Sequence, residues 1–250
     1  MTYCCGIMVR EGLVMVADTR TNAGLDNIAT FRKLHVFEKA GERVLMLACA
    51  GNLSVTQGVV NFINDGFENP ETGEIENVMS AANMLQAAQL VGRAVRRARA
   101  EAHSAVEQSA GVSFDVSLLL GGQIAGSAPR LFMIYTAGNS IECTPDTNYL
   151  QIGEHKYGKP ILDRAVNYET DIYDALKIGL ISMDSTIRSN LSVGLPVDVA
   201  LLRRDALALD VSTRIDGNDE YFRDLRERWS KALRDAHMAI PAPPYRGREP

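Results

Sequence analysis

The chain has 250 residues, of which 46% are hydrophobic and 23% are charged, and its formal net charge is −5 at pH 7. These values are typical of a soluble globular protein, and the negative charge argues against nucleic acid or an anionic membrane as the main partner. No apolar run approaches the roughly 18 residues of a transmembrane helix, and the N-terminus lacks an apolar signal sequence, so we expect a cytoplasmic protein.

The first half of the chain predicts four strands and two helices. Two β-rich runs, Tyr3–Val9 and 13–19, are joined by a hairpin turn at Arg10, Glu11 and Gly12. Further strands are expected at 33–37 and 44–50. A helix should follow, with Ser54 and Gln57 as its capping box, and an alanine-rich pattern over 78–106 predicts a long second helix.

The second half predicts short strands first and helices later. The strands are expected around 114–122, 129–138, 142–144 and 148–153, the helices at 159–166 and 171–190, a second hairpin at 197–214, and a charged helix at 219–236 before an extended tail. Strands and helices do not alternate one for one, which argues against a doubly wound parallel sheet. We therefore predict the α+β class: a four-layer α/β/β/α sandwich of two antiparallel sheets with an extra C-terminal helix.

The C-terminal segment differs in character from the rest. Residues 1–214 are expected to form one domain, and 215–250 a helix and tail at a subunit interface. An apolar stripe crosses this charged helix and comprises Tyr221, Phe222, Leu225, Trp229 and Leu233. It could pack on its own domain or on a neighbouring subunit, and we favour the neighbour.

The four cysteines, Cys4, Cys5, Cys49 and Cys143, show neither a CxxC nor a Cys/His metal spacing. We interpret them as buried reduced thiols and predict no metal and no organic cofactor. The basic run GRAVRRAR, with Arg93, Arg96, Arg97 and Arg99, spreads around a helix and is interpreted as a solvated face or an interface with salt bridges. Nucleic-acid binding is the weaker interpretation.

Thr2 raises a specific chemical possibility. If Met1 is removed, Thr2 carries both a hydroxyl and a free α-amine, whose ordinary pKa of about 7.7–8.0 suits a base at neutral pH. One residue then supplies nucleophile and base, so no histidine is needed. The alternative is that a hydroxyl residue occupies position two by chance and has no catalytic role.

Three further residues could organise such a nucleophile. Asp18 is the acid within the second strand, and a three-residue turn would pair Val9 with Leu13 and so put Asp18 on the face of Thr2. Lys33 is the candidate cation, and the N–H groups around Gly51 could hold a developing oxyanion. The alternatives are an Asp satisfied by turn amides, a solvated surface lysine, and a glycine that eases a strand-to-helix turn.

The joint spacing of these features resembles the proteasome β-subunit family of N-terminal-nucleophile hydrolases. The resemblance rests on Thr2, VADTR with Asp18, RK with Lys33 and ACAG with Gly51, and extends to Asp210. The phrases MTYCCGI, IGEHKYGKPILDR and MDSTIRSNLSVGLPVD resemble more narrowly the bacterial Anbu (ancestral β-subunit) group, which is related to HslV-type peptidases.

The resemblance implies threonine-dependent cleavage of peptide or amide bonds in a homo-oligomeric ring or spiral, acting on a peptide or protein substrate. It implies Thr2 as nucleophile and base, Asp18 and Lys33 as the pair that organises it, and Gly51 and Thr21 as oxyanion- and substrate-binding residues. An ATPase partner follows from the resemblance alone. No long propeptide is expected ahead of Thr2.

The chain also departs from the family pattern. Glu154 stands where proteasomal β-subunits usually have a serine, and their second Asp and Ser fall near Asn190 and Ser192. These departures put an ordinary peptidase rate and specificity in doubt. The alternative function is therefore a proteasome-like scaffold, or an amide-bond-forming assembly, with weak or silent peptidase activity.

Overall fold

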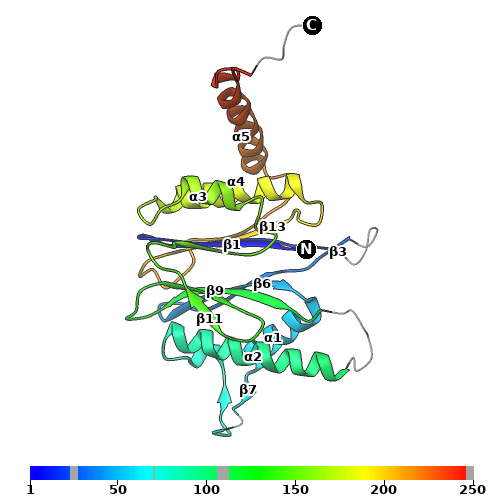
Figure 1. The fold of residues 1–250 in the computed structure, drawn as a ribbon. Coiled ribbons are helices and arrows are strands. Elements are labelled where there is room, and N and C mark those ends of the chain that lie inside the picture. The colour runs from blue at the N-terminus through cyan, green and yellow to red at the C-terminus, as the bar shows by residue number, and fades with distance from the viewer. Residues whose placement is uncertain (23–27, 70, 106–112, 246–250) are drawn as a thin grey trace.

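Two five-stranded antiparallel sheets lie face to face at the centre of the molecule (Figure 1). The computed structural model describes residues 1–22, 28–69, 71–105 and 113–245. The first sheet contains, in spatial order, β12 (Tyr149–Gly153), β1 (Tyr3–Val9), β2 (Gly12–Asp18), β13 (Val197–Arg203) and β14 (Val211–Ile215). The second contains β11 (Ser140–Glu142), β10 (Arg130–Ile134), β9 (Val116–Ile124), β6 (Arg43–Gly51) and β5 (Leu34–Lys39).

Helices cover the outer face of each sheet (Figure 1). The helices α3 (Lys159–Ala165) and α4 (Ile172–Ser189) lie on the first sheet, while α1 (Leu53–Asp65) and α2 (Met84–Ala105) lie on the second. The predicted α/β/β/α sandwich is thereby confirmed.

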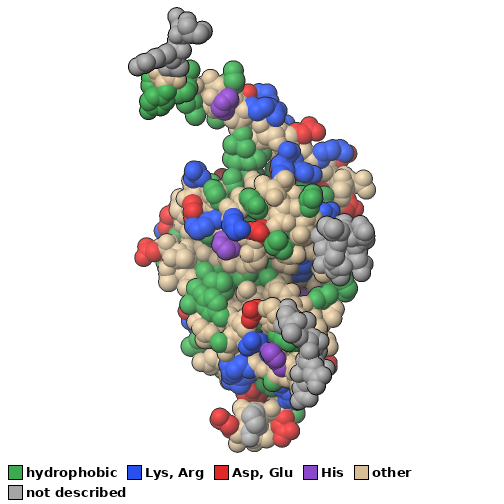
Figure 2. All heavy atoms as spheres, turned by 45° about the vertical axis from the view of Figure 1, so that its right-hand side comes forward, with side chains coloured by type: hydrophobic (Ala, Val, Ile, Leu, Met, Phe, Trp, Pro, Cys, Tyr) green, Lys and Arg blue, Asp and Glu red, His purple; other side chains and the backbone are tan. Residues whose placement is uncertain are grey.

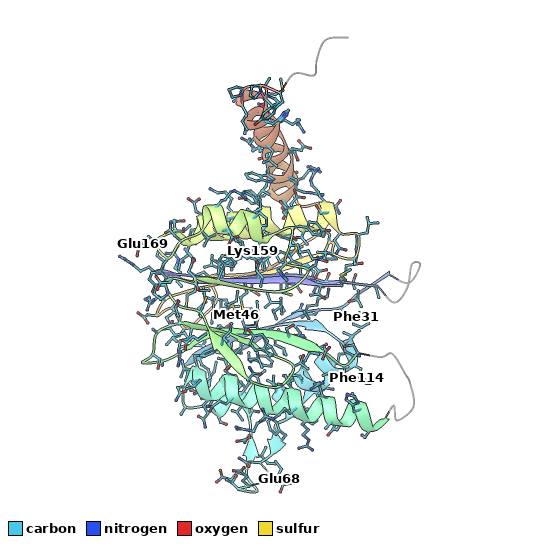
Figure 3. All side chains as sticks on the ribbon, in the orientation of Figure 1. Phe31, Met46, Glu68, Phe114, Lys159 and Glu169 are labelled. Atoms are coloured by element: carbon cyan, nitrogen blue, oxygen red, sulfur yellow. The ribbon has the colours of Figure 1, made fainter. Side chains whose placement is uncertain are left out.

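The burial of β1 and β2 follows from this layering. Every residue of both strands is buried, because one face of the sheet packs on α4 and the other on the second sheet. Tyr3, Val14 and Val16 belong to the helix-side core, whereas Met15 belongs to the core between the sheets. Met46 of β6 lies in that inner core as well, between the two sheets in Figure 3.

The turn between β1 and β2 corrects the predicted register. Val9 pairs with Gly12, so Arg10 and Glu11 alone form the turn and Cys4 pairs with Ala17. The expected three-residue turn, with Val9 opposite Leu13, is wrong. Gly12 is required for close packing rather than for a bulge, since a Cβ there would lie 2.1 Å from the carbonyl oxygen of Leu202 in β13.

Several other local expectations are corrected. The N-cap of α1 is Asn52, whose side chain accepts from the N–H of Val55, so the predicted Ser54 and Gln57 capping box is not used. The alanine-rich segment divides into a 3₁₀ turn, η1 (Val78–Ser80), and α2. Two small ribbons were not predicted: β3 (Arg20–Asn22) with β4 (Ile28–Thr30), and β7 (Phe67–Glu68) with β8 (Ile75–Glu76).

The last helix, α5 (Glu220–Ala239), projects away from the sandwich beyond α4 (Figures 1 and 2). Phe222 and Leu225 at its inner end are buried in the helix-side core, and Arg226 pairs with the fully buried Asp184 of α4 at 2.5 Å. Leu233, further out, is 52% exposed. The predicted apolar stripe is thus half covered by the chain's own domain.

Two findings bear on the remaining sequence interpretations. Among the described residues, no helix is long and apolar enough to cross a membrane. Two arginines of the basic run bind acidic side chains of the same chain, Arg93 with Glu76 and Arg97 with Glu101.

Candidate functional site

A cleft of about 940 Å³ opens where the start of the chain meets the second sheet. Its walls include four of the five predicted site residues: Thr2, Thr21, Lys33 and Gly51. Phe31, at the edge of the sandwich in Figure 3, lines it as well. Asp18 lies behind Lys33, fully buried.

Thr2 is held in place through its backbone. Its carbonyl oxygen accepts a hydrogen bond from the N–H of Glu154 at 2.7 Å, which extends the pairing between β1 and β12 to the beginning of the chain. The adjacent Gly153 has a φ of +80°, and a Cβ there would lie 2.0 Å from the same oxygen. The close approach of β12 therefore fixes where Thr2 lies.

The carboxylate of Asp18 accepts hydrogen bonds from three groups. The N–H of Tyr3 donates to Oδ1 at 3.0 Å, Lys33 Nζ donates to the same oxygen at 2.8 Å, and the N–H of Gly194 donates to Oδ2 at 3.3 Å. Asp18 is the last residue of β2, so its side chain can reach past the strand end to the start of β1. The predicted three-residue turn is therefore not needed to bring Asp18 to the start of the chain: the turn has two residues, and Asp18 still contacts Tyr3 and Lys33.

Lys33 is a buried cation rather than a solvated surface lysine, with 6% of its surface exposed. Besides Asp18, Nζ donates to the carbonyl oxygen of Arg20 at 2.6 Å and lies 3.5 Å from that of Met1. The ammonium group is therefore next to the peptide bond that joins Met1 to Thr2.

Gly51 ends β6 at a φ of +109°, and a Cβ there would lie 2.2 Å from the carbonyl oxygen of Asp115. N–H groups alternate in direction along a strand, so the N–H of Gly51 points to the same side as that of Cys49, which donates to the carbonyl oxygen of Lys33. The strand β5 begins at Leu34, opposite Ala48, so no residue of β5 lies beside Gly51. The N–H of Gly51 therefore faces the cleft, which Gly51 lines. The N-terminus of α1 follows directly and adds a positive dipole.

The charged groups around the start of the chain shift the pKa of its α-amine in opposite directions. Burial and the ammonium group of Lys33 lower the pKa of the α-amine of Met1, while Asp18 and Glu154 oppose this shift. Burial raises the pKa of Asp18 above its usual range, with Lys33 acting against burial. After removal of Met1, the amine of Thr2 would face the same charges.

Sequence reasoning missed several residues that support the site. The Tyr3 hydroxyl hydrogen-bonds Ser182 Oγ of α4 at 2.6 Å and accepts from Gln151 Nε2 of β12. A Cβ at Gly158 would lie 2.3 Å from that hydroxyl, which explains the glycine of the YG pair. Asn190, which follows α4, donates to Glu154 at 3.1 Å. The sequence analysis noted Glu154 and Asn190 only as departures from the family pattern and did not predict their contact.

The cysteines and possible metal ligands can be placed as well. All four cysteines are buried and free, and Cys49 lines the cleft. Within the described ranges, three or more His, Cys, Asp or Glu side chains never gather in a way that could hold a metal ion.

Comparison with known proteins adds a family relationship. The family model described as "Proteasome subunit" matches residues 2–202. A mutant of Anbu from Hyphomicrobium sp. strain MC1 is 46% identical, with 98% of this chain and 100% of that chain covered and a TM-score of 0.88. Anbu (ancestral beta-subunit) from Yersinia bercovieri is 44% identical, with 96% and 98% covered and a TM-score of 0.87.

A third solved structure is the helical assembly of the Anbu complex from Pseudomonas aeruginosa. It is 42% identical, with 97% of this chain and 98% of that chain covered, and its TM-score is 0.88. No curated protein matches the chain.

Proposed function

Because the chain belongs to the proteasome subunit family and, within it, to the Anbu group, we propose that it is a cytoplasmic threonine hydrolase of peptide or amide bonds. Removal of Met1 exposes the α-amine of Thr2. The observation that carries the proposal is the contact of Lys33 Nζ with both the Asp18 carboxylate, at 2.8 Å, and the Met1 carbonyl oxygen, at 3.5 Å.

The first half of the reaction forms an ester. The α-amine of Thr2 accepts the hydroxyl proton as Oγ bonds to the substrate carbonyl carbon, and the oxyanion so formed accepts a hydrogen bond from the N–H of Gly51. The ammonium then gives its proton to the departing amine as the C–N bond breaks. An acyl ester on Thr2 and a free amine are the products of this half.

The second half returns the site to its starting state. A water molecule gives a proton to the α-amine and attacks the ester carbonyl, and the proton returns to Oγ as the C–O bond breaks. Lys33 provides positive charge beside the nucleophile, and Asp18 holds that charge in place. Thr21 and Gly51, which both line the cleft, would bind the backbone of an extended substrate.

We also propose that the chain assembles with copies of itself through residues 215–250. The outer part of α5 presents Leu233, Met238 and Ile240, which are 52%, 77% and 71% exposed. Hydrophobic side chains gather toward the outer end of this projection (Figure 2). Covering such a surface is favourable, and a second copy of α5 would offer the matching face.

The test of the enzyme proposal is turnover of fluorogenic peptides by the chain that begins at Thr2. Thr2→Ala should abolish hydrolysis, whereas Thr2→Ser, which keeps both hydroxyl and amine, should retain part of it. Equal turnover by wild type and Thr2→Ala would overturn the proposal.

A further inference from the structure

We propose that Glu154 is a positioning residue for the α-amine of Thr2: its carboxylate, oriented by Asn190, stabilises the protonated amine beside the nucleophile. The inference rests on the proposed function, because it assigns a further residue to the same site. It is carried by the placing of Glu154, by the hydrogen bonds of Asn190 and by the other charges at the chain start.

Glu154 follows β12 directly and contacts the start of the chain. Its N–H donates to the carbonyl oxygen of Thr2 at 2.7 Å, and only 9% of its surface is exposed. Met1, Thr2 and Glu154 line the same cleft. The backbone hydrogen bond therefore holds Glu154 beside the start of the chain.

Asn190 orients that carboxylate. Its Oδ1 accepts from the N–H of Ser192 at 2.9 Å, so the opposite end of the amide, Nδ2, faces Glu154 and donates to Oε2 at 3.1 Å. Nδ2 also lies 3.7 Å from the sulfur of Met1. The amide therefore holds the carboxylate near the residue whose removal exposes the amine, without neutralising its negative charge.

Glu154 differs from Asp18 in how its negative charge is paired. Asp18 is paired with the buried Lys33, whereas the cation near Glu154 is Lys156, whose side chain is 72% exposed and whose Nζ lies 3.7 Å from Oε1. Solvent screens an exposed cation more than a buried one. Among the described residues, the other charged or titratable side chains that line the cleft are Arg32, His35 and Cys49, and Arg20 lies beside Lys33, whose Nζ donates to the Arg20 carbonyl oxygen.

The chemical consequence concerns both the resting state and the reaction. A carboxylate beside the amine favours the ammonium form, so a higher pH is needed to free the base. The same carboxylate stabilises the ammonium that forms when the amine takes the hydroxyl proton. Glu154 thus opposes the effect of Lys33 on the amine. It shifts the pH range in which the amine is a free base toward alkaline pH.

Competitive labelling with acetic anhydride between pH 5 and 10 tests this inference. The chain beginning at Thr2 is prepared with methionine aminopeptidase, and mass spectrometry of its N-terminal peptide gives the pKa of the amine. Glu154→Gln should lower that pKa by about one unit. Asn190→Ala should lower it by less. Glu68→Gln, the same change on an exposed side chain at the far end of the sandwich (Figure 3), should leave it unchanged.

An unchanged amine pKa in folded Glu154→Gln would overturn the inference. If that variant does not fold, Asn190→Ala decides in the same way, with an unchanged value against the inference. The labelling needs no turnover, so its outcome is separate from that of the proposed function. A shifted pKa in a chain that hydrolyses nothing would count against the hydrolase and leave the role of Glu154 standing.

Discussion

Lys33 Nζ lies 2.8 Å from Asp18 Oδ1, although one residue ends a strand of the first sheet and the other stands just before a strand of the second. Asp18 ends β2 of the first sheet, and Lys33 directly precedes β5 of the second. Both side chains are buried. This ion pair therefore joins the two sheets beside the cleft, which Lys33 lines.

Breaking this pair should destabilise the fold. Lys33→Met leaves the Asp18 carboxylate buried without its cation, and the expected loss is about 3–5 kcal/mol of unfolding free energy in urea titrations. The double variant Asp18→Asn with Lys33→Met should recover most of that loss but none of the peptidase activity.

Lys177→Met is the matched control for the same change at an exposed ion pair. Lys177 pairs with Asp174 on the surface of α4, where the expected loss is below about 1 kcal/mol. Losses of equal size at Lys33 and Lys177 would contradict the structural importance given to the buried pair.

The pH dependence of hydrolysis should report the α-amine of Thr2. Burial and Lys33 lower the pKa of the α-amine of Met1 from its usual 8.0, and we expect the same direction of shift for the amine of Thr2 once Met1 is removed, so that its free base is present at a lower pH than in a solvated amine. A profile of kcat/KM should therefore rise with pH and reach half its plateau below pH 8. A midpoint above about 9 would contradict the assignment of the amine as base.

The hydroxyl of Tyr3, the residue after Thr2, should contribute to the stability of the fold. Tyr3→Phe leaves Ser182 and Gln151 without their buried partner, and a loss of about 1–3 kcal/mol is expected in thermal or urea unfolding. Gly158→Ala should cost at least as much, because its Cβ would lie 2.3 Å from the same hydroxyl. Gly217→Ala, with no atom within 4 Å of the added Cβ, is the control and should change little.

Self-assembly should depend on the outer part of α5. Leu233→Asp places a charge on the exposed apolar surface and should reduce the mass measured by light scattering, while circular dichroism stays unchanged. Ile75→Asp makes a similar change at a residue that is 67% exposed in β8, and should leave the mass as in wild type. If Leu233→Asp has the same mass as wild type, α5 does not form the contact between copies.

The order of elements along the chain was enough to predict the fold. Strand runs with buried faces, separated by pairs of helices, leave few arrangements other than two antiparallel sheets between helix layers. The hairpin register could not be predicted in the same way. Gly12 is compatible with a turn of two or three residues. In the structure Gly12 is part of β2 and packs closely on the backbone of β13, which agrees with the shorter turn.

The candidate site was predictable only in part. Thr2, Asp18, Lys33 and Gly51 are conspicuous in type and setting, and their spacing resembles a known family. The contacts of Asn190 with Glu154 and of Gly194 with Asp18 join segments far apart in the chain. Such contacts depend on how α4 and the loop after it pack on the first sheet, which no local pattern encodes.

The most direct measurement is the intact mass of the purified chain before and after treatment with a peptide epoxyketone, which reacts with a hydroxyl and an α-amine on the same residue. The hydrolase proposal predicts that Met1 is absent, that one equivalent of label bonds to Thr2, and that Thr2→Ala takes up none. A chain that keeps Met1 and stays unlabelled, or equal labelling of Thr2→Ala, would contradict it and favour the scaffold alternative.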